Sequence, residues 1–126
     1  GFAGEQDVKT SRGAFWTAYK DVDAATEDFR RAKKAADTEG AQIADKRAYL
    51  RALAGHAEKA RKMATARRDK IDELMADESK SLGHKRLVVA EMEKAEKKAY
   101  DDFLAVYATA LSTHRSKSPA AAALVH

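Results

Sequence analysis

Apolar residues recur every seven positions along much of the chain. A first series is apolar at every step, and a second series, three residues later, is apolar at most steps but includes Glu39, Lys46 and Arg67. Two such series are typical of amphipathic helices with coiled-coil-like seams. The first series consists of Val8, Phe15, Val22, Phe29, Ala36, Ile43, Leu50, Ala57, Ala64 and Ile71, and the apolar members of the second are Ala18, Ala25, Ala32, Leu53, Ala60 and Leu74.

Beyond Glu78 the apolar pattern resumes in a shifted frame, which predicts a further helix. Its apolar stripe consists of Val88, Met92, Ala95, Ala99, Phe103, Val106 and Ala110.

Two polar stretches interrupt these stripes. The segment from Asp77 to Lys85 contains serines, a glycine and charged residues, which can end one helix and cap the next, and we expect a tight turn there. The segment from Asp37 to Gln42 also predicts a turn, with Asp37 or Thr38 as the cap. However, the seven-residue frame runs through this second segment without a slip, so one continuous helix remains an alternative.

The pattern therefore predicts an all-α fold, an elongated antiparallel three-helix bundle with coiled-coil-like seams. The helices are expected at about residues 6–37, 41–78 and 85–114, within a single domain of residues 1–114, followed by a C-terminal tail at 115–126. Alanine forms about a fifth of the chain and there is one proline, a composition that favours long helices over strands. In the alternative, the first two helices join into one of about 70 residues, roughly 105 Å long.

Charge and cysteine content narrow the functional classes only slightly. Charged residues make up 35% of the chain, and the net charge is +4 with both signs interleaved, a weaker basic excess than that of dedicated nucleic-acid binders. The chain has no cysteine, so we expect an intracellular, reducing compartment; a mitochondrial location is compatible with this. No stretch is apolar enough for a membrane span. The first residue is Gly1 rather than methionine, and we expect that preceding residues have been removed.

The densest basic run lies between Ala54 and Leu74. Its side chains, together with a shorter basic run near residue 30, are candidates for contact with an acidic polymer. The competing interpretation is ion pairing, with Arg61 and Lys62 level with Asp101 and Asp102, and with the seam residue Arg67 reaching a carboxylate such as Glu96. The candidate polyanion contacts are Arg61, Lys62, Arg68, Lys70, Arg30 and Arg31, with Lys33 and Lys34 beside them.

Aromatic residues at the edges of the seams are candidates for protein contacts, because rim aromatics often anchor interfaces. These candidates are Trp16, Tyr19 and Tyr100. Core packing is the competing interpretation, since tryptophan and tyrosine are often mostly buried.

No catalytic, cofactor-binding or metal-binding residues are predicted. The four histidines are scattered without the spacing of a helical metal pair, and no glycine-rich phosphate loop or nucleophile motif is present. A thin helical rod also offers no enclosed apolar cleft in which carboxylate pKa values would shift. We therefore expect a protein that is not an enzyme and that takes no small-molecule substrate.

The function expected from these features is structural: a helical-bundle subunit or scaffold of a larger assembly, whose partners are other protein subunits. The alternative is a binder of acidic polymer, either RNA in a ribonucleoprotein or an anionic membrane surface, acting through basic helix faces. A helical coat of lipid droplets or membranes is a third interpretation. Binding to a polyanion weakens steeply with added salt, whereas assembly through apolar edges hardly responds.

Overall fold

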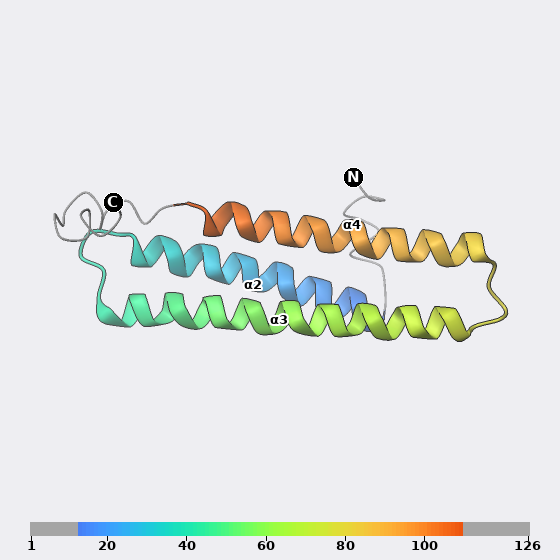
Figure 1. Ribbon diagram of the computed structural model, residues 1–126. Helices are drawn as coiled ribbons and strands as arrows, with labels where there is room; N and C mark the ends of the chain where they lie inside the picture. Colours follow the sequence, from blue (N-terminus) through green and yellow to red (C-terminus); the bar gives the residue numbers. More distant parts are fainter. Residues whose placement is uncertain (1–12, 110–126) are drawn as a thin grey trace, which may run out of the picture.

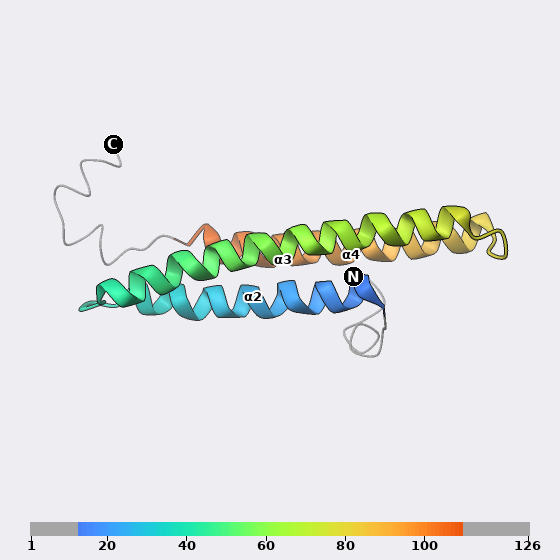
Figure 2. The same ribbon diagram turned by 90° about the horizontal axis from the view of Figure 1, so that it is seen from below.

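The computed structural model describes residues 13–109, which form three α-helices joined by two turns (Figure 1). They are α2 (Ala14–Ala36), α3 (Ile43–Ala76) and α4 (Leu82–Tyr107). The three run antiparallel in sequence order, side by side, as an elongated bundle (Figures 1 and 2). This confirms the predicted all-α three-helix bundle.

The first helix begins later than the predicted start near residue 6. Gly13, the residue before α2, has φ +116°, a conformation that is open to glycine and that a helix cannot continue through. Residues 6–12, the seam position Val8 and the tail at 115–126 lie outside the described residues, as does the predicted end of the last helix beyond 109.

The alternative of one continuous helix through Asp37–Gln42 is wrong. Gly40 has φ +88°, and a new helix begins after Gln42. Gln42, rather than Asp37 or Thr38, is the cap of α3: its backbone N–H donates to Asp45 Oδ2 at 2.8 Å within a capping box.

The turn predicted between Asp77 and Lys85 is confirmed. The Ser79 backbone N–H and hydroxyl both donate to Asp77 Oδ1, at 2.9 and 2.6 Å, and these hydrogen bonds lower the pKa of the Asp77 carboxyl. Ser81 then caps α4 by accepting from the backbone N–H of His84 at 3.1 Å.

Helix α2 lies at the centre of the packing: its backbone approaches α3 most extensively and α4 next, whereas α3 and α4 meet mainly through side chains, such as His56 with Phe103 and Arg67 with Glu96. One half of the core joins residues of all three helices: Phe15, Ala18, Tyr19, Val22, Met63, Met92, Ala95 and Ala99. In the other half, the fully buried ring of Phe29 contacts Tyr49 and Phe103, with centroids 5.3 and 5.1 Å away.

The predicted seams of α2 and α4 are largely buried, but on α3 only the second series, which includes Leu74, lies on the buried side, and the first series does not. Ile43 and Leu50 are 68% and 60% exposed, and Ala57 and Ala64 are also exposed. The buried face of α3 is centred instead on His56, Met63 and Leu74. The physical reason is the turn at Asp37–Gln42: because the helix stops there, α3 can rotate about its axis, and the seven-residue frame no longer fixes which face meets α2.

Candidate interaction surface

The rotation of α3 leaves a row of apolar side chains on its outer surface, at heptad spacing. We call this the exposed heptad row; it consists of Ile43, Leu50, Ala57, Ala64 and Ile71. The first four residues are exposed and Ile71 is half-buried. Helix α3 thus has one apolar face packed against α2 and a second that is exposed from Ile43 to Ala64, while Ile71 at its end packs against the core.

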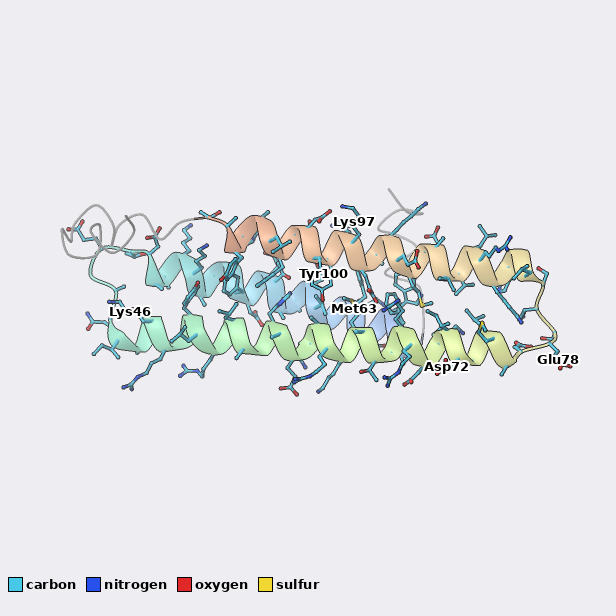
Figure 3. All side chains as sticks on the ribbon, viewed as in Figure 1. Lys46, Met63, Asp72, Glu78, Lys97 and Tyr100 are labelled. Carbon is cyan, nitrogen blue, oxygen red and sulfur yellow. The ribbon has the colours of Figure 1, made fainter. Side chains whose placement is uncertain are left out.

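The last helix adds exposed apolar side chains of its own. Tyr100, Leu104 and Tyr107 are each about half exposed and recur at the spacing of one helix face. Burial, together with the neighbouring Tyr107, raises the pKa of Tyr49 of α3. Figure 3 shows Tyr100 on the side of α4 that faces α3.

A groove lies at the end of the bundle where α3 and α4 meet and where no residue of α2 lines the surface. Its volume is about 260 Å³, and we call it the tip groove. Its residues are Ile71, Leu74, Met75, Leu82, Lys85, Arg86, Val89, Ala90 and Glu93. Met75 and Leu82 are 75% and 61% exposed, which is unusual for large apolar side chains that lie next to each other.

A shallow hollow on α3 continues from the tip groove. The two share Ile71, and the hollow extends over Ala64 and Thr65 between Arg61, Arg67 and Arg68. The exposed heptad row therefore leads directly into the tip groove.

The three predicted partner-contact aromatics lie in different environments. Tyr19 is 6% exposed and belongs to the core, where its ring packs against Trp16 at 5.9 Å, so it presents almost no surface to a partner. Trp16 is half-buried and also packs edge-on against Phe15, at 4.9 Å. Only Tyr100, 49% exposed, lies beside the exposed apolar residues described above.

The candidate polyanion contacts on α3 point in several directions around the helix. By helix geometry, Arg61 and Lys62 are about 100° apart around the axis, and Arg68 and Lys70 are about 160° apart. Most have a carboxylate nearby: Lys62 lies 3.8 Å from Glu58, Arg68 lies 4.0 Å from Asp69, and Lys70 lies 3.3 Å from Glu73. These residues therefore do not form one continuous basic face.

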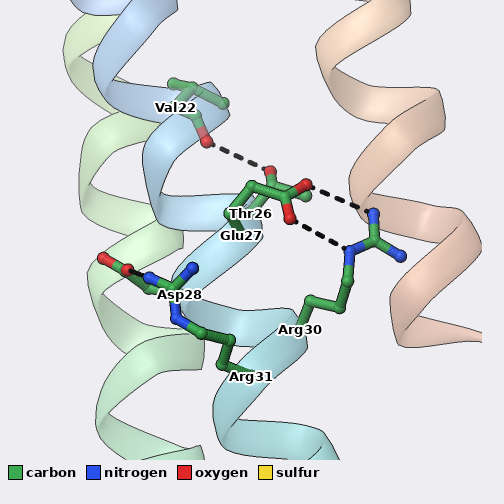
Figure 4. Close-up of polar contacts among 6 residues, drawn as sticks. All are labelled: Val22, Thr26, Glu27, Asp28, Arg30 and Arg31. Carbon is green, nitrogen blue, oxygen red and sulfur yellow. Dashed lines mark hydrogen bonds and ion pairs between the residues drawn. The ribbon is translucent and has the colours of Figure 1, made fainter.

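The shorter basic run on α2 is neutralised in the same way. Arg30 pairs with Glu27 at 3.3 Å and Arg31 pairs with Asp28, each one helical turn earlier (Figure 4). Lys34 is exposed. Lys33, which the sequence grouped with them, is 5% exposed, and its ammonium donates to two carbonyl oxygens of α4, so it presents no charge to a polyanion.

Ion pairing between the helices follows the predicted pattern at one position. Arg67 Nε lies 2.7 Å from Glu96 Oε1, and burial of this carboxyl raises the pKa of Glu96 despite the neighbouring guanidinium. The expected pairing of Arg61 and Lys62 with Asp101 and Asp102 is not observed. Those aspartates pair within α4 instead, with Lys97 at 2.6 Å and Lys98 at 2.7 Å.

One buried histidine is the most unusual polar group in the core. His56 is 4% exposed, its ring is stacked on Phe103 with centroids 3.7 Å apart, and its Nε2 has no hydrogen-bond partner among the described residues. Burial lowers the pKa of His56, because the charged imidazolium would lose its hydration there. The sequence places His56 beside the seam but gives no sign of this stacking.

Residues 13–109 contain no cluster of three histidine, cysteine, aspartate or glutamate side chains placed to bind a metal ion. None of the helices α2 to α4 combines the length and apolar character needed to cross a bilayer.

The sequence matches no known protein family, and it shows no significant similarity to a curated protein or to a solved structure. The geometry of the chain itself therefore provides the basis for a functional proposal.

Proposed function

We propose that this protein is a non-enzymatic structural or interaction protein, a helical-bundle subunit or scaffold whose partners are other proteins. The observation that carries this proposal is the exposed heptad row of α3. Heptad spacing of apolar residues is the pattern by which one helix packs against another. In this chain the first four residues of the pattern, Ile43 to Ala64, lie on an exposed face of α3.

The half-exposed aromatic face of α4 supports the same proposal. Aromatic side chains bury a large area for little loss of conformational entropy and are enriched where proteins meet. With Leu104 between them, Tyr100 and Tyr107 give α4 an exposed apolar edge.

Binding of an acidic polymer remains the second candidate. Arg61 is the one observation in its favour, because it alone of the six candidate cations has no carboxylate at ion-pair distance among the described residues. The ion pairs of the other five reduce the charge available to phosphates, although exposed pairs of this kind are weak and can exchange partners.

Photo-crosslinking in the native cell distinguishes these functions. p-Benzoylphenylalanine is placed at Leu104, on the apolar edge of α4, and as a matched control at Ala24, which is exposed on α2. We expect discrete, nuclease-resistant protein adducts from position 104 and few from position 24. Adducts to RNA or lipid alone, or equal adducts from both positions, would contradict the proposal.

A further inference from the structure

The tip groove and the hollow beside it form one continuous surface, and its shape fits a helix. Its apolar floor includes Ala64, Ile71, Met75, Leu82 and Val89. From Ala64 to Met75 the floor extends roughly 16 Å along α3, which corresponds to about three turns of a bound helix. Because the tip-groove part of this floor lies between α3 and α4, it suits an inserted helix better than a flat lipid surface.

The charges around this floor are mostly of one sign. Five lining residues are basic and one, Glu93, is acidic; the basic residues are Arg61, Arg67, Arg68, Lys85 and Arg86. Arg67 is already neutralised by Glu96. Arg61 and Arg86 have no carboxylate partner at ion-pair distance in the part of the chain that the structure describes.

This charge distribution selects among occupants. A second copy that docked groove to groove would place one basic rim against another, and like charges across an interface are costly. A helix with carboxylates on both sides of its apolar stripe would instead meet Arg61 and Arg68 on α3 and Arg86 on α4.

We propose that the tip groove, with the hollow over Ala64, binds an acidic amphipathic helix of a partner protein. This inference rests on the proposed function and specifies the chemistry of the partner. Apolar residues of that helix at i, i+3, i+4 and i+7 cover Ile71, Met75 and Leu82, and its glutamates or aspartates pair with the basic rim.

Because the chain has no cysteine, the groove can be labelled at a single position. Met75→Cys carries an environment-sensitive fluorophore, and Leu87→Cys, exposed on another face of α4, is the matched control. The probes are two helical peptides of about 14 residues, or four turns, with leucines at the spacing above. One peptide has glutamates beside the leucines, and the other has the same leucines with lysines in place of the glutamates.

We expect the glutamate peptide to shift the emission at position 75 but not at position 87, and to bind at least about tenfold more tightly than the lysine peptide. The double variant Arg61→Glu, Arg86→Glu is expected to reverse this preference. The matched control is Arg51→Glu, Lys94→Glu, which changes the net charge equally at exposed positions away from the groove and leaves the preference intact. Circular dichroism serves as the control that each variant is folded.

Equal binding of both peptides would overturn this inference, as would a response at position 75 to vesicles of anionic lipid but not to the glutamate peptide. A dimer in sedimentation that Met75→Glu abolishes would show that a second copy occupies the groove. Much faster labelling at position 75 after removal of residues 1–12 or 110–126 would show that the chain itself covers it. If neither peptide binds but position 104 still forms protein crosslinks, the groove assignment is wrong and the proposed function stands. If neither peptide binds and position 104 forms no protein crosslinks, the groove assignment and the proposed function are both wrong.

Discussion

Lys33, near the end of α2, donates a hydrogen bond from Nζ to the carbonyl oxygen of Val106, at the end of α4, across 2.6 Å. A second hydrogen bond, 2.9 Å long, reaches the carbonyl of Tyr107. The last carbonyls of a helix lack partners within it and carry partial negative charge, so a buried ammonium there satisfies them. Burial lowers the pKa of Lys33, and the nearby Asp37 carboxylate opposes this shift in part.

Replacing this lysine by an apolar residue of similar length should loosen the end of α4. We expect Lys33→Met to lower the free energy of unfolding by about 2 kcal/mol, because two charge-assisted hydrogen bonds are lost. Lys34→Met, at the adjacent exposed position, should change it by less than about 0.5 kcal/mol. Urea denaturation of both variants measures the difference, and equal effects would show that the contact with α4 contributes nothing.

The assignment of the two faces of α3 can be tested by truncating side chains. Met63→Ala, on the buried face of α3, should destabilise the fold by about 2–5 kcal/mol. Leu50→Ala, at a heptad position that is 60% exposed, should cost less than about 1 kcal/mol. A cost of more than 2 kcal/mol for Leu50→Ala would show that the heptad row is buried, as the sequence frame predicted. Chemical denaturation measures both values.

His56 should make stability depend on pH. Its pKa in the folded state lies below the ordinary value of 6.5, so the unfolded chain binds the proton more readily. The contribution of His56 to stability is therefore complete above pH 6.5 and decreases as the pH falls from 6.5 toward the lowered folded pKa. Thermal denaturation between pH 8 and pH 5 should show this decrease.

The matched variants for this test are His56→Phe and His84→Gln. The first retains a flat ring against Phe103 and removes the unsatisfied Nε2; we expect it to flatten the pH dependence and to raise stability at pH 7 by about 1 kcal/mol. The second changes an exposed histidine in the first turn of α4 and should leave the pH dependence as it is. An unchanged pH dependence in His56→Phe would refute this role.

The ion pair between Arg67 and Glu96 should couple α3 to α4 more strongly than the surface pairs do. A double-mutant cycle with Arg67→Met and Glu96→Gln is expected to give a coupling of about 1 kcal/mol, because both side chains are partly buried. The same cycle on Lys97 and Asp101, an exposed pair within α4, should give about 0.3–0.5 kcal/mol. Equal couplings would mean that the pair between the helices adds nothing to their association.

The sequence predicted the fold well where side-chain pattern alone decides it. The stripes of α2 and α4, the turn at Asp77–Lys85 and the approach of Arg67 to Glu96 all follow from spacing and residue type. The phase of α3 could not be predicted, because a heptad frame carries no information about rotation across a turn such as that at Gly40. For the same reason the exposed heptad row and the tip groove were missed, and Tyr19 was counted as a candidate surface residue.

The roles of individual charges were also beyond prediction from sequence. Lys33 and Lys34 are adjacent and identical, yet one caps α4 and the other is exposed. The sequence spacing allowed Asp101 and Asp102 to pair either with α3 or within α4, and they pair with lysines of α4. Such choices depend on distances between helix axes, which periodicity does not determine.

The proposal that a partner protein covers the apolar surface between α3 and α4 in the native assembly can be tested by cysteine labelling. Single cysteines are placed at Met75 in the groove, at Met63 in the core and at Leu87 on another face of α4. In the purified protein, positions 75 and 87 should react quickly and position 63 slowly. In the native assembly, position 75 alone should slow by about tenfold or more. A rate at position 75 that is the same in both states would contradict the claim.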